Sequence, residues 1–347
     1  MTDALAALGW NDRWLALYTS AVEGRAAAHP SRPGRVVRHD GVAVLVAGDD
    51  AAESLPVLAS VEPAPVVGDW VVVDAETEAV IEVLDRTSLL RRLDPDGVTE
   101  QALVANLDAL LIVCGLDRPV KTGRIQRTAA LAWDAGATPV VVLTKADLAD
   151  DVDVVAEGVR VANPGIDVLV TSATDAQGLD EVRTLVDGRT IVLLGESGAG
   201  KSTLTNALVG TDVVATGEVR KGDAKGRHTT TRRELHVLPS GGVLIDTPGI
   251  RSVGLWVDPD AVAATFDDIE ELSEGCRFRD CAHAGEPGCA VAAAVEAGEL
   301  AAERWEAWQA LHKEAQSAAL RADAHAQHQA DRRFGKIARE AQRQKRP

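Results

Sequence analysis

The sequence predicts a multidomain α/β protein, in which a small β-barrel is followed by a doubly wound sheet and then by a helical segment. Three observations lead to this prediction. Short β-branched runs separated by Gly, Pro and Asp fill residues 34–90, strand-like runs then alternate with helical stretches, and a Cys/His cluster precedes a long Ala-rich stretch. We expect three domains, which span residues 1–97, 98–257 and 258–347.

The composition excludes several protein classes. A chain of 347 residues is long enough for two or three domains with buried cores, and its hydrophobic fraction of 46% is ordinary for globular proteins. There is no run of about 18 apolar residues, so we expect no transmembrane helix. The first residues lack a secretory signal pattern, and 4 cysteines are too few for a disulfide scaffold. We expect a cytoplasmic, monomeric protein without membrane attachment.

The charge is distributed unevenly along the chain. Its formal net charge is −17, which normally argues against a nucleic-acid partner, but the segment from Arg332 to the end carries seven basic residues and one acidic residue. This segment is interpreted either as a solvated tail or as an arm that contacts RNA phosphates. Its candidate RNA-contacting residues are Arg332, Arg333, Lys336, Arg339 and Arg343.

The first segment combines a helix with a barrel. An amphipathic helical candidate carries Leu8, Trp14, Leu15 and Tyr18. After it, about five short strand-like runs predict a small barrel of the OB or SH3-like kind. These runs span residues 34–40, 42–48, 54–60, 68–76 and 79–86.

The second segment predicts a sheet with ligand contacts at the carboxyl ends of its strands, as in doubly wound α/β folds. Its apolar runs each end in a polar loop, and they read LDALLIVCGL, ATPVVVLTKAD, IDVLVTSA, RTIVLLGESG and GGVLIDTPG. We interpret Cys114, inside the first of these runs, as a small core residue.

A phosphate-binding loop lies between one of these strands and a helix that continues through Thr203. The motif G-x-x-x-x-G-K-[ST] is formed by Gly195, Glu196, Ser197, Gly198, Ala199, Gly200, Lys201 and Ser202. The backbone N–H groups of such a loop turn toward a phosphate, the Lys201 ammonium reaches the β- and γ-phosphates, and the Ser202 hydroxyl binds Mg²⁺. The alternative is a Gly-rich turn without a ligand.

Two further elements follow the phosphate loop. Asp246 and Gly249 belong to an Asp-Thr-Pro-Gly sequence after a strand, where the carboxylate can hold Mg²⁺ through water and the Gly N–H can contact the γ-phosphate. Between the two motifs lies a polar segment containing His228 and the run Thr229 to Thr231, as expected of a switch that orders around Mg²⁺. We favour Thr230 as the Mg²⁺ ligand among these threonines.

Two candidate base-reading elements precede the phosphate loop. The first is Thr144, Lys145, Ala146 and Asp147, which resembles the Asn-Lys-x-Asp element of GTPases, with Asp147 accepting hydrogen bonds from guanine. The second is Ser172 with Ala173, which resembles the element whose backbone N–H meets guanine O6. Consecutive strands place both elements where one ligand can touch them. Contacts of this kind survive when the chain is reopened elsewhere in the fold.

The order of these motifs resembles one known family, the circularly permuted GTPases of the ribosome small subunit-dependent GTPase A (RsgA/YjeQ) family. The resemblance covers nearly the whole chain and includes the barrel and the Cys/His cluster. It implies an OB-type β-barrel, a circularly permuted P-loop GTPase domain and a helical zinc-binding domain. It also implies GTP hydrolysis with Mg²⁺, stimulated by the small ribosomal subunit, whose rRNA and proteins the family meets during late maturation of that subunit.

The resemblance also implies a catalytic role for His228. Ras-like enzymes place a Gln after the Asp-x-x-Gly element to orient the attacking water, but Ile250 occupies that position here. By resemblance, His228 is the residue that positions this water, a role suited to an imidazole near neutral pH.

A metal site is predicted in the third segment. Cys276, Cys281, His283 and Cys289 offer three thiolates and one imidazole, a closed set of the kind that holds structural Zn²⁺, although buried or redox-active cysteines are an alternative. The resemblance carries the zinc-ligand roles onto these four residues. Leu300, Trp305, Trp308 and Leu311 follow at helical spacing and are interpreted as core.

Some features depart from the family pattern. Thr144 replaces Asn, which removes an amide that usually braces the base site. The barrel is acidic and contains one Trp, Trp70, whereas OB-type binding normally needs a basic groove with stacking aromatics. We expect it to contact RNA through few residues, such as Arg35 and Arg38, or to meet ribosomal protein.

Two rival functions are a P-loop ATPase or kinase, and a zinc-containing RNA-binding nucleotide switch with negligible turnover.

Overall fold

The computed structural model describes residues 2–23, 30–49, 51–93, 100–210, 233–247, 259–283, 285–317 and 320. The chain forms two compact units, of which the first contains Met1–Arg91 with Ala102–Val253 and the second Arg92–Gln101 with Gly254–Pro347. The three-domain boundaries at residues 97 and 257 stay predictions. None of the helices in the described ranges has the length and apolar character needed to cross a membrane.

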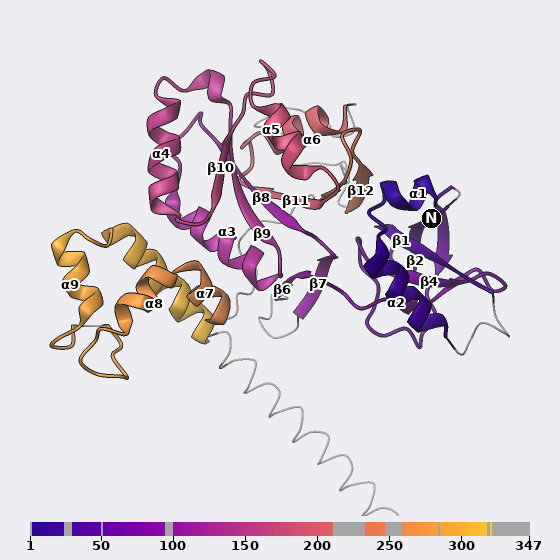
Figure 1. Cartoon of the computed structure of the whole chain (residues 1–347), viewed down its shortest axis with the longest axis horizontal. Coiled ribbons are helices and arrows are strands. Elements are labelled where there is room, and N and C mark those ends of the chain that lie inside the picture. The colour runs from indigo at the N-terminus through magenta and orange to yellow at the C-terminus, as the bar shows by residue number, and fades with distance from the viewer. Residues whose placement is uncertain are drawn as a thin grey trace, which may run out of the picture. The chain divides into compact units, whose positions relative to one another are not determined.

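The N-terminal part is a five-stranded ring that we call the barrel (Figure 1). Strand β1 pairs antiparallel with both β2 and β4, β2 pairs with β3, and β4 pairs with β5. A parallel bridge between Val57 and Val80 closes the ring. Valine and leucine side chains such as Val36 and Val71 fill its interior, as the period-2 pattern predicts. The strands are β1 (Ser31–His39), β2 (Ala43–Ala47), β3 (Glu53–Pro56), β4 (Trp70–Asp74) and β5 (Ala79–Val83).

The single helix predicted before the barrel is in fact two, α1 (Asp3–Ala7) and α2 (Asp12–Val22). Gly9 has φ +89° and interrupts the helical path, and the Asn11 side chain caps α2 by accepting from two backbone N–H groups. The break turns Leu15 to solvent, with 51% of its surface exposed, whereas Trp10 packs edge-on against Trp70 at a centroid distance of 4.7 Å.

The central sheet has the strand order β10-β9-β8-β11-β13-β12, and all neighbouring pairs except β12–β13 are parallel. The five apolar runs that predicted this sheet each contain one of its parallel strands. The strands are β8 (Ala109–Gly115), β9 (Thr138–Thr144), β10 (Asp167–Val170), β11 (Thr190–Gly195), β12 (Glu234–Val237) and β13 (Val243–Asp246). The sequence did not predict β12, nor the separate two-stranded sheet of β6 (Leu89–Leu93) and β7 (Glu100–Ala105).

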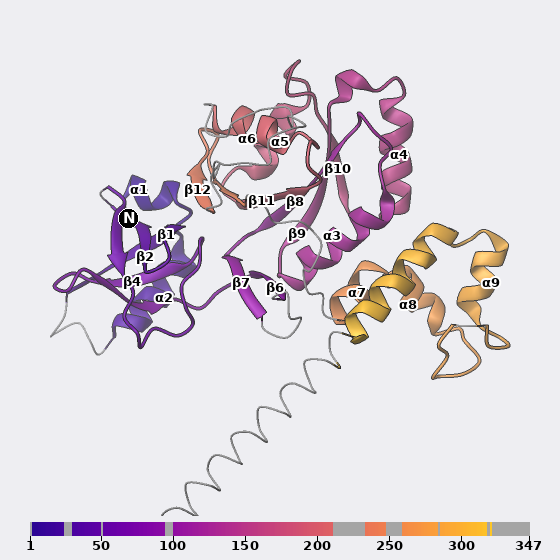
Figure 2. The same ribbon diagram turned by 180° about the vertical axis from the view of Figure 1, so that it is seen from behind.

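Helices cover both faces of the central sheet (Figures 1 and 2). Helices α3 (Thr122–Asp134) and α4 (Val152–Ala162) lie on one face, and α5 (Leu179–Val186) and α6 (Lys201–Val209) pack on the other. The chain runs outward from β8 to β10 and then returns to place β11 on the other side of β8. The topological switch point therefore lies between β8 and β11, where open α/β sheets bind ligands.

The second unit is helical among its described C-terminal residues. It contains α7 (Pro259–Thr265), α8 (Asp267–Ser273), α9 (Ala290–Ala297) and a helix over residues 302–317. The Arg304 guanidinium donates to the Asp268 carboxylate at 2.6 and 2.7 Å and lies over the Phe266 ring. Leu300, Trp308 and Leu311 are buried, so their predicted role as core residues is confirmed.

Arg35 corrects one expectation about the barrel. It is one of the two candidate RNA contacts of the barrel, but only 1% of its surface is exposed. Its guanidinium donates to the backbone oxygens of Leu8, Gly68 (3.2 Å) and Asn106 (3.4 Å) and to Thr190 Oγ1 (2.9 Å), and it lies over the Trp70 ring. Burial lowers the pKa of Arg35 to about 10, against the opposing effect of Asp108 and Asp69, so the group stays charged near neutral pH.

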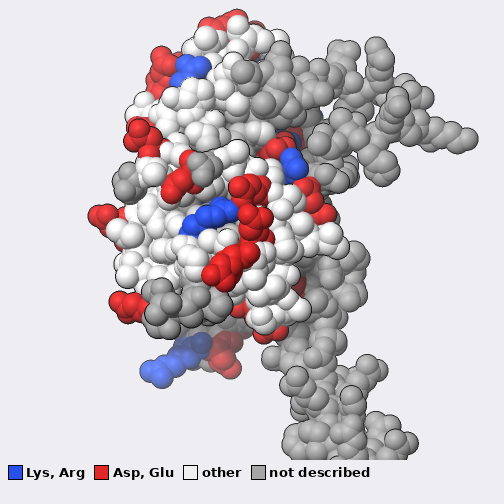
Figure 3. Space-filling view, turned by 90° about the vertical axis from the view of Figure 1, so that its right-hand side faces the viewer, with Lys and Arg blue, Asp and Glu red and all other residues white. Residues whose placement is uncertain are grey.

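The outer surface of the barrel is acidic (Figure 3). Arg38 is partly exposed, but its guanidinium donates to Asp40 at 3.0 Å and lies 3.6 Å from Glu234. Arg32 pairs in the same way with Glu53. Arginines that are already neutralised by neighbouring carboxylates offer little charge to a polyanion.

We predict that Arg35→Met lowers the free energy of unfolding by about 3 to 5 kcal/mol, because it leaves several buried acceptors unpaired. Urea unfolding of the full chain, followed by tryptophan fluorescence, measures this loss. The control is Arg38→Met on the same strand, which removes a partly exposed ion pair and costs less than about 1 kcal/mol. Equal losses for the two variants would contradict the role assigned to Arg35.

Candidate functional site

The predicted ligand residues lie at the carboxyl edge of the central parallel strands. The phosphate loop follows β11 and leads into α6, and Asp246 ends the neighbouring strand β13. Lys201 begins α6 and donates from Nζ to the carbonyl oxygens of Gly195 (2.8 Å) and Glu196 (2.6 Å). Burial lowers the pKa of Lys201 and raises that of Asp246, and the opposite charge of each group opposes the shift of the other.

Glycine is required at two positions of this loop. A Cβ on Gly195 would lie 2.2 Å from the Val113 carbonyl oxygen of β8. Gly200 has φ +90°, a conformation that side chains rarely adopt, and a Cβ there would lie 3.1 Å from Thr144 Oγ1. The loop therefore packs closely against the ends of β8 and β9.

The two base-reading elements lie side by side. Ser172 is fully buried, and its hydroxyl donates to Asp147 Oδ1 at 2.6 Å. This hydrogen bond lowers the pKa of Asp147, which is exposed and stays ionised. The backbone N–H of Ala146 donates to the Thr171 carbonyl at 3.3 Å, which joins the segment after β9 to the end of β10. Ala173 follows Ser172 and is partly exposed.

Thr144 contacts the phosphate loop directly. Its hydroxyl donates to the Ala199 carbonyl at 2.6 Å and lies 3.3 Å from the Cys114 carbonyl, and its side chain is buried. Thr144 lacks the amide that Asn would supply, but its hydroxyl donates a hydrogen bond to the phosphate loop. The candidate base-reading element and the predicted phosphate loop are joined at this residue.

Asp117 and Arg118, which the sequence analysis missed, also belong to this site. They follow β8, and Arg118 donates to Asp117 Oδ2 (2.8 Å) and to the Ser197 carbonyl of the phosphate loop (3.4 Å). Lys145 Nζ donates to the same Asp117 oxygen (2.9 Å) and to the Gly198 carbonyl (2.6 Å). The signal that could have identified them is their position, since polar residues after a central strand reach the same sheet edge as the other motifs.

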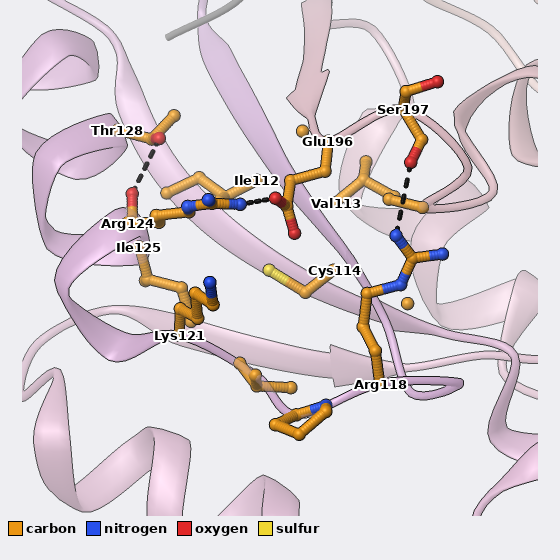
Figure 4. Close-up of a pocket in the computed structure, with 15 residues that line it drawn as sticks. Ile112, Val113, Cys114, Arg118, Lys121, Arg124, Ile125, Thr128, Glu196 and Ser197 are labelled. Atoms are coloured by element: carbon orange, nitrogen blue, oxygen red, sulfur yellow. Dashed lines mark hydrogen bonds and ion pairs between the residues drawn. The ribbon is translucent and has the colours of Figure 1, made fainter. Parts of the chain in front are cut away.

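A cavity of about 380 Å³ lies beside the phosphate loop, between the end of β8 and the start of α3 (Figure 4). Its apolar part includes Ile112 and Ile125, and Cys114 lines it rather than the closed core, with burial raising the pKa of the thiol to about 11. Arg124 of α3 reaches across to pair with Glu196, which offsets the charge of a carboxylate inside the phosphate loop (Figure 4).

Several predicted residues lie outside the described ranges. These are His228, the threonines Thr229, Thr230 and Thr231, Gly249, and the basic residues from Arg332 onward. Ser202 and Thr203 are described and lie in the first turn of α6, where Ser202 is partly buried and Thr203 is exposed.

The predicted metal ligands come together in the second unit. One ligand atom from each of Cys276, Cys281, His283 and Cys289 lies within 4.8 Å of the others. His283 Nδ1 lies 3.6 Å from the Cys276 sulfur and 3.4 Å from the Cys289 sulfur, close to the roughly 3.5 Å that tetrahedral Zn–S and Zn–N bonds require.

The surroundings of the cluster also suit a metal. The backbone N–H groups of Ala290 and Ala292 each approach a cluster sulfur at 3.4 Å, a contact that stabilises a thiolate. The His283 ring packs edge-on against Trp305 and Trp308, which fixes its orientation. These four residues could therefore hold one metal ion.

Comparison with known proteins identifies the family. The family model described as RsgA GTPase matches residues 83–256. The small ribosomal subunit biogenesis GTPase RsgA of Streptomyces coelicolor is 42% identical, and the alignment covers 98% of this chain and 96% of that protein. The chain belongs to the RsgA GTPase family. A relative of the same name from Xanthomonas axonopodis is 44% identical over 91% of this chain and 89% of its own length.

Two solved structures are similar to this RsgA GTPase family member. YjeQ from Thermotoga maritima superimposes with a TM-score of 0.60 at 27% identity, covering 83% of this chain and 99% of that one. YloQ, titled a circularly permuted GTPase, gives a TM-score of 0.59 at 27% identity, covering 83% of this chain and 96% of that one. The GTPase fold is thus circularly permuted, as the motif order predicted. A model described as ABC transporter also matches residues 182–339, a range that includes the phosphate loop.

We predict that Thr144→Val lowers the free energy of unfolding by about 1 to 3 kcal/mol and weakens GDP binding, because the buried Ala199 carbonyl loses its donor. Thermal unfolding and titration with fluorescent GDP measure the two effects. Thr144→Ser is the matched control, since it keeps the hydroxyl and changes only a methyl group. If Ser and Val variants behave alike, the hydrogen bond has no such role.

Proposed function

We propose that this protein binds the small ribosomal subunit and hydrolyses GTP to GDP and phosphate during late maturation of that subunit. The observation that carries the proposal is the meeting of base-reading and phosphate-binding elements at one sheet edge, in permuted order. Relatives that carry the name small ribosomal subunit biogenesis GTPase align with nearly the full length of the chain, which supports the same partner here. The proposed architecture is an OB-type barrel (1–97), a permuted GTPase domain (98–257) and a zinc-binding domain (258–347).

The proposed nucleotide contacts follow from chemistry and position. Asp147 accepts from the guanine N1–H and amine, and the backbone near Ser172 and Ala173 meets O6. Backbone N–H groups of the phosphate loop and the Lys201 ammonium hold the phosphates. Mg²⁺ neutralises phosphate charge when bound, and Ser202, Thr230 and Asp246 are the residues proposed to hold it, directly or through water. The hydrogen bond from Ser172 to Asp147 supports the first of these assignments, because it orients the carboxylate before a base arrives.

His228 is proposed to position the attacking water. The residue after the Asp-Thr-Pro-Gly sequence is Ile250, which has no group to orient water, so the polar residue must come from another segment. An imidazole can accept a proton from water near neutral pH and hold it during attack on the γ-phosphate. Thr230 and Gly249 are proposed to contact Mg²⁺ and the γ-phosphate.

The remaining parts of the chain are proposed to bind a structural metal and to bind RNA. Zn²⁺ suits the three-thiolate, one-imidazole set, with no open position for a substrate. The basic residues from Arg332 onward are proposed to contact rRNA, because the described arginines of the barrel surface pair with carboxylates. We also propose a monomeric, cytoplasmic protein without membrane attachment.

We predict that phosphate release from GTP is slow for the protein alone and rises at least tenfold when purified small ribosomal subunits are added, because a partner must order the switch. Matched reactions with ATP test the ATPase alternative, and matched reactions with large subunits test partner specificity. GTP binding without stimulation by small subunits would favour the alternative, a zinc-containing RNA-binding switch with negligible turnover.

We predict that His228→Ala lowers subunit-stimulated phosphate release about 100-fold and leaves GTP affinity within about twofold, since the residue acts on the water and not on the nucleotide. Single-turnover phosphate release and equilibrium binding of a fluorescent GTP analogue separate the two quantities. His39→Ala is the control, because it removes an exposed imidazole at the end of β1 without altering the segment around residue 228. Full stimulated turnover by His228→Ala would exclude this catalytic role.

We predict that the chain carries one Zn²⁺ and that Cys276→Ser loses it, with local unfolding of the helices around the cluster. Metal analysis measures the Zn²⁺ content, and limited proteolysis with circular dichroism measures the unfolding. Cys114→Ser is the matched control, because it removes the cysteine outside the cluster and should retain the metal. Retention of stoichiometric zinc by Cys276→Ser would contradict the proposed ligand set.

A further inference from the structure

Three consecutive carbonyl groups of the phosphate loop are held by side chains from outside the loop. The Ser197 carbonyl accepts from Arg118 at 3.4 Å, the Gly198 carbonyl from Lys145 at 2.6 Å and the Ala199 carbonyl from Thr144 at 2.6 Å. Arg118 follows β8, and the other two residues end or follow β9. The loop is thus held from β8, which lies beside its own strand β11, and from β9, which lies on the other side of β8.

These three hydrogen bonds determine which way the loop's N–H groups face. In a planar trans peptide, the carbonyl of one residue and the N–H of the next point in opposite directions. With the Gly198 carbonyl held outward, the Ala199 N–H must face the loop interior, and there it donates to the Glu196 carbonyl at 3.2 Å. Lys201 Nζ contacts the same Glu196 oxygen, so this N–H and the ammonium lie on one side of the loop. That side is where a phosphate would be bound.

Asp117 joins two of the three contacts. Its Oδ2 accepts from Lys145 (2.9 Å) and from Arg118 (2.8 Å), while Oδ1 accepts from Arg118 Nε at 3.2 Å. The hydrogen bonds from Arg118 and then Lys145 lower the pKa of Asp117 to about 2, so the group is an anion near neutral pH. A Cβ on Gly115 would lie 2.6 Å from Asp117 Oδ1, which shows how closely this carboxylate packs on the end of β8.

We propose that Asp117 and Arg118 are positioning residues for nucleotide binding. Asp117 holds the Arg118 and Lys145 cations on neighbouring carbonyls of the phosphate loop, and these contacts keep the loop's N–H groups directed at the phosphates. Neither residue contacts the nucleotide itself. This inference rests on the proposed function, because it assumes that the loop binds the phosphates of a guanine nucleotide.

The geometry favours an effect on the phosphate side of the site over an effect on the base side. Both cations that Asp117 holds end on carbonyls of the phosphate loop. Asp147, which would read the base, is held instead by Ser172. Loss of Asp117 should therefore lower the affinity for every nucleotide that carries a β-phosphate by the same factor, whatever the base of that nucleotide.

The experiment compares Asp117→Asn, Arg118→Ala and the double variant in the full chain. Fluorescent GDP is displaced in a stopped-flow instrument, and affinities for unlabelled GDP and IDP are measured by competition. We expect Asp117→Asn to weaken GDP binding about tenfold, as for loss of a hydrogen bond to a charged group. The double variant should lose no more GDP affinity than Asp117→Asn alone, because both residues act in one network. Glu157→Gln, which removes the carboxylate of an exposed ion pair on α4, should leave binding unchanged.

The ratio of GDP to IDP affinity separates the phosphate side from the base side, because IDP lacks the exocyclic amine that Asp147 is proposed to read. An unchanged ratio supports the inference, and a reduced ratio would show that Asp117 acts through the base and would overturn it. Unchanged GDP affinity in Asp117→Asn, or additive losses in the double variant, would overturn it as well. Failure of the wild-type chain to bind any guanine nucleotide would instead reject the proposed function, on which the inference rests.

Discussion

The first unit depends on one buried guanidinium. Arg35 lies on β1 of the barrel, and its acceptors come from the end of α1, from the loop before β4, from the segment between β7 and β8 and from the first residue of β11. A neutral side chain has too few donors for these positions, and a lysine ammonium lacks the planar fork that meets several at once. The barrel and the strand that carries the phosphate loop therefore share one hydrogen-bonded centre.

The same residue illustrates what sequence can and cannot predict. The strands of the central sheet were predictable because each is a long apolar run that ends in a polar motif, and these features are local. The burial of Arg35 was not, because nothing in its neighbourhood in the sequence indicates that four acceptors from distant segments surround it. The break between α1 and α2 depends on Gly9 and on the packing of Trp10 against Trp70, which is also a tertiary effect.

The residues of the nucleotide site also fall into two groups, those that the sequence could predict and those that it could not. Residues that are proposed to touch a ligand belong to short motifs with recognisable spacing, so the sequence alone could indicate the phosphate loop and both candidate base-reading elements. Two of the residues that act on the loop from outside, Asp117 and Arg118, belong to no motif. Asp117 and Arg118 matter only because β8 lies next to β11, a neighbour relation that the order of the chain does not display. The Cys/His cluster falls between these cases, since its four residues are close in sequence while the aromatic rings against His283 come from a later helix.

The order in which the chain is synthesised affects how the phosphate loop forms, because the side chains that hold the loop come earlier in the sequence. A chain is synthesised from its N-terminus, and segments that emerge first can begin to fold first. In this permuted arrangement Asp117, Arg118, Thr144 and Lys145 all precede Gly195. The side chains that set the direction of the loop's peptide groups are thus synthesised before the loop. When β11 pairs with β8, the residues that hold the loop are already part of the sheet. In the unpermuted order the loop would be synthesised first, before the residues that hold it.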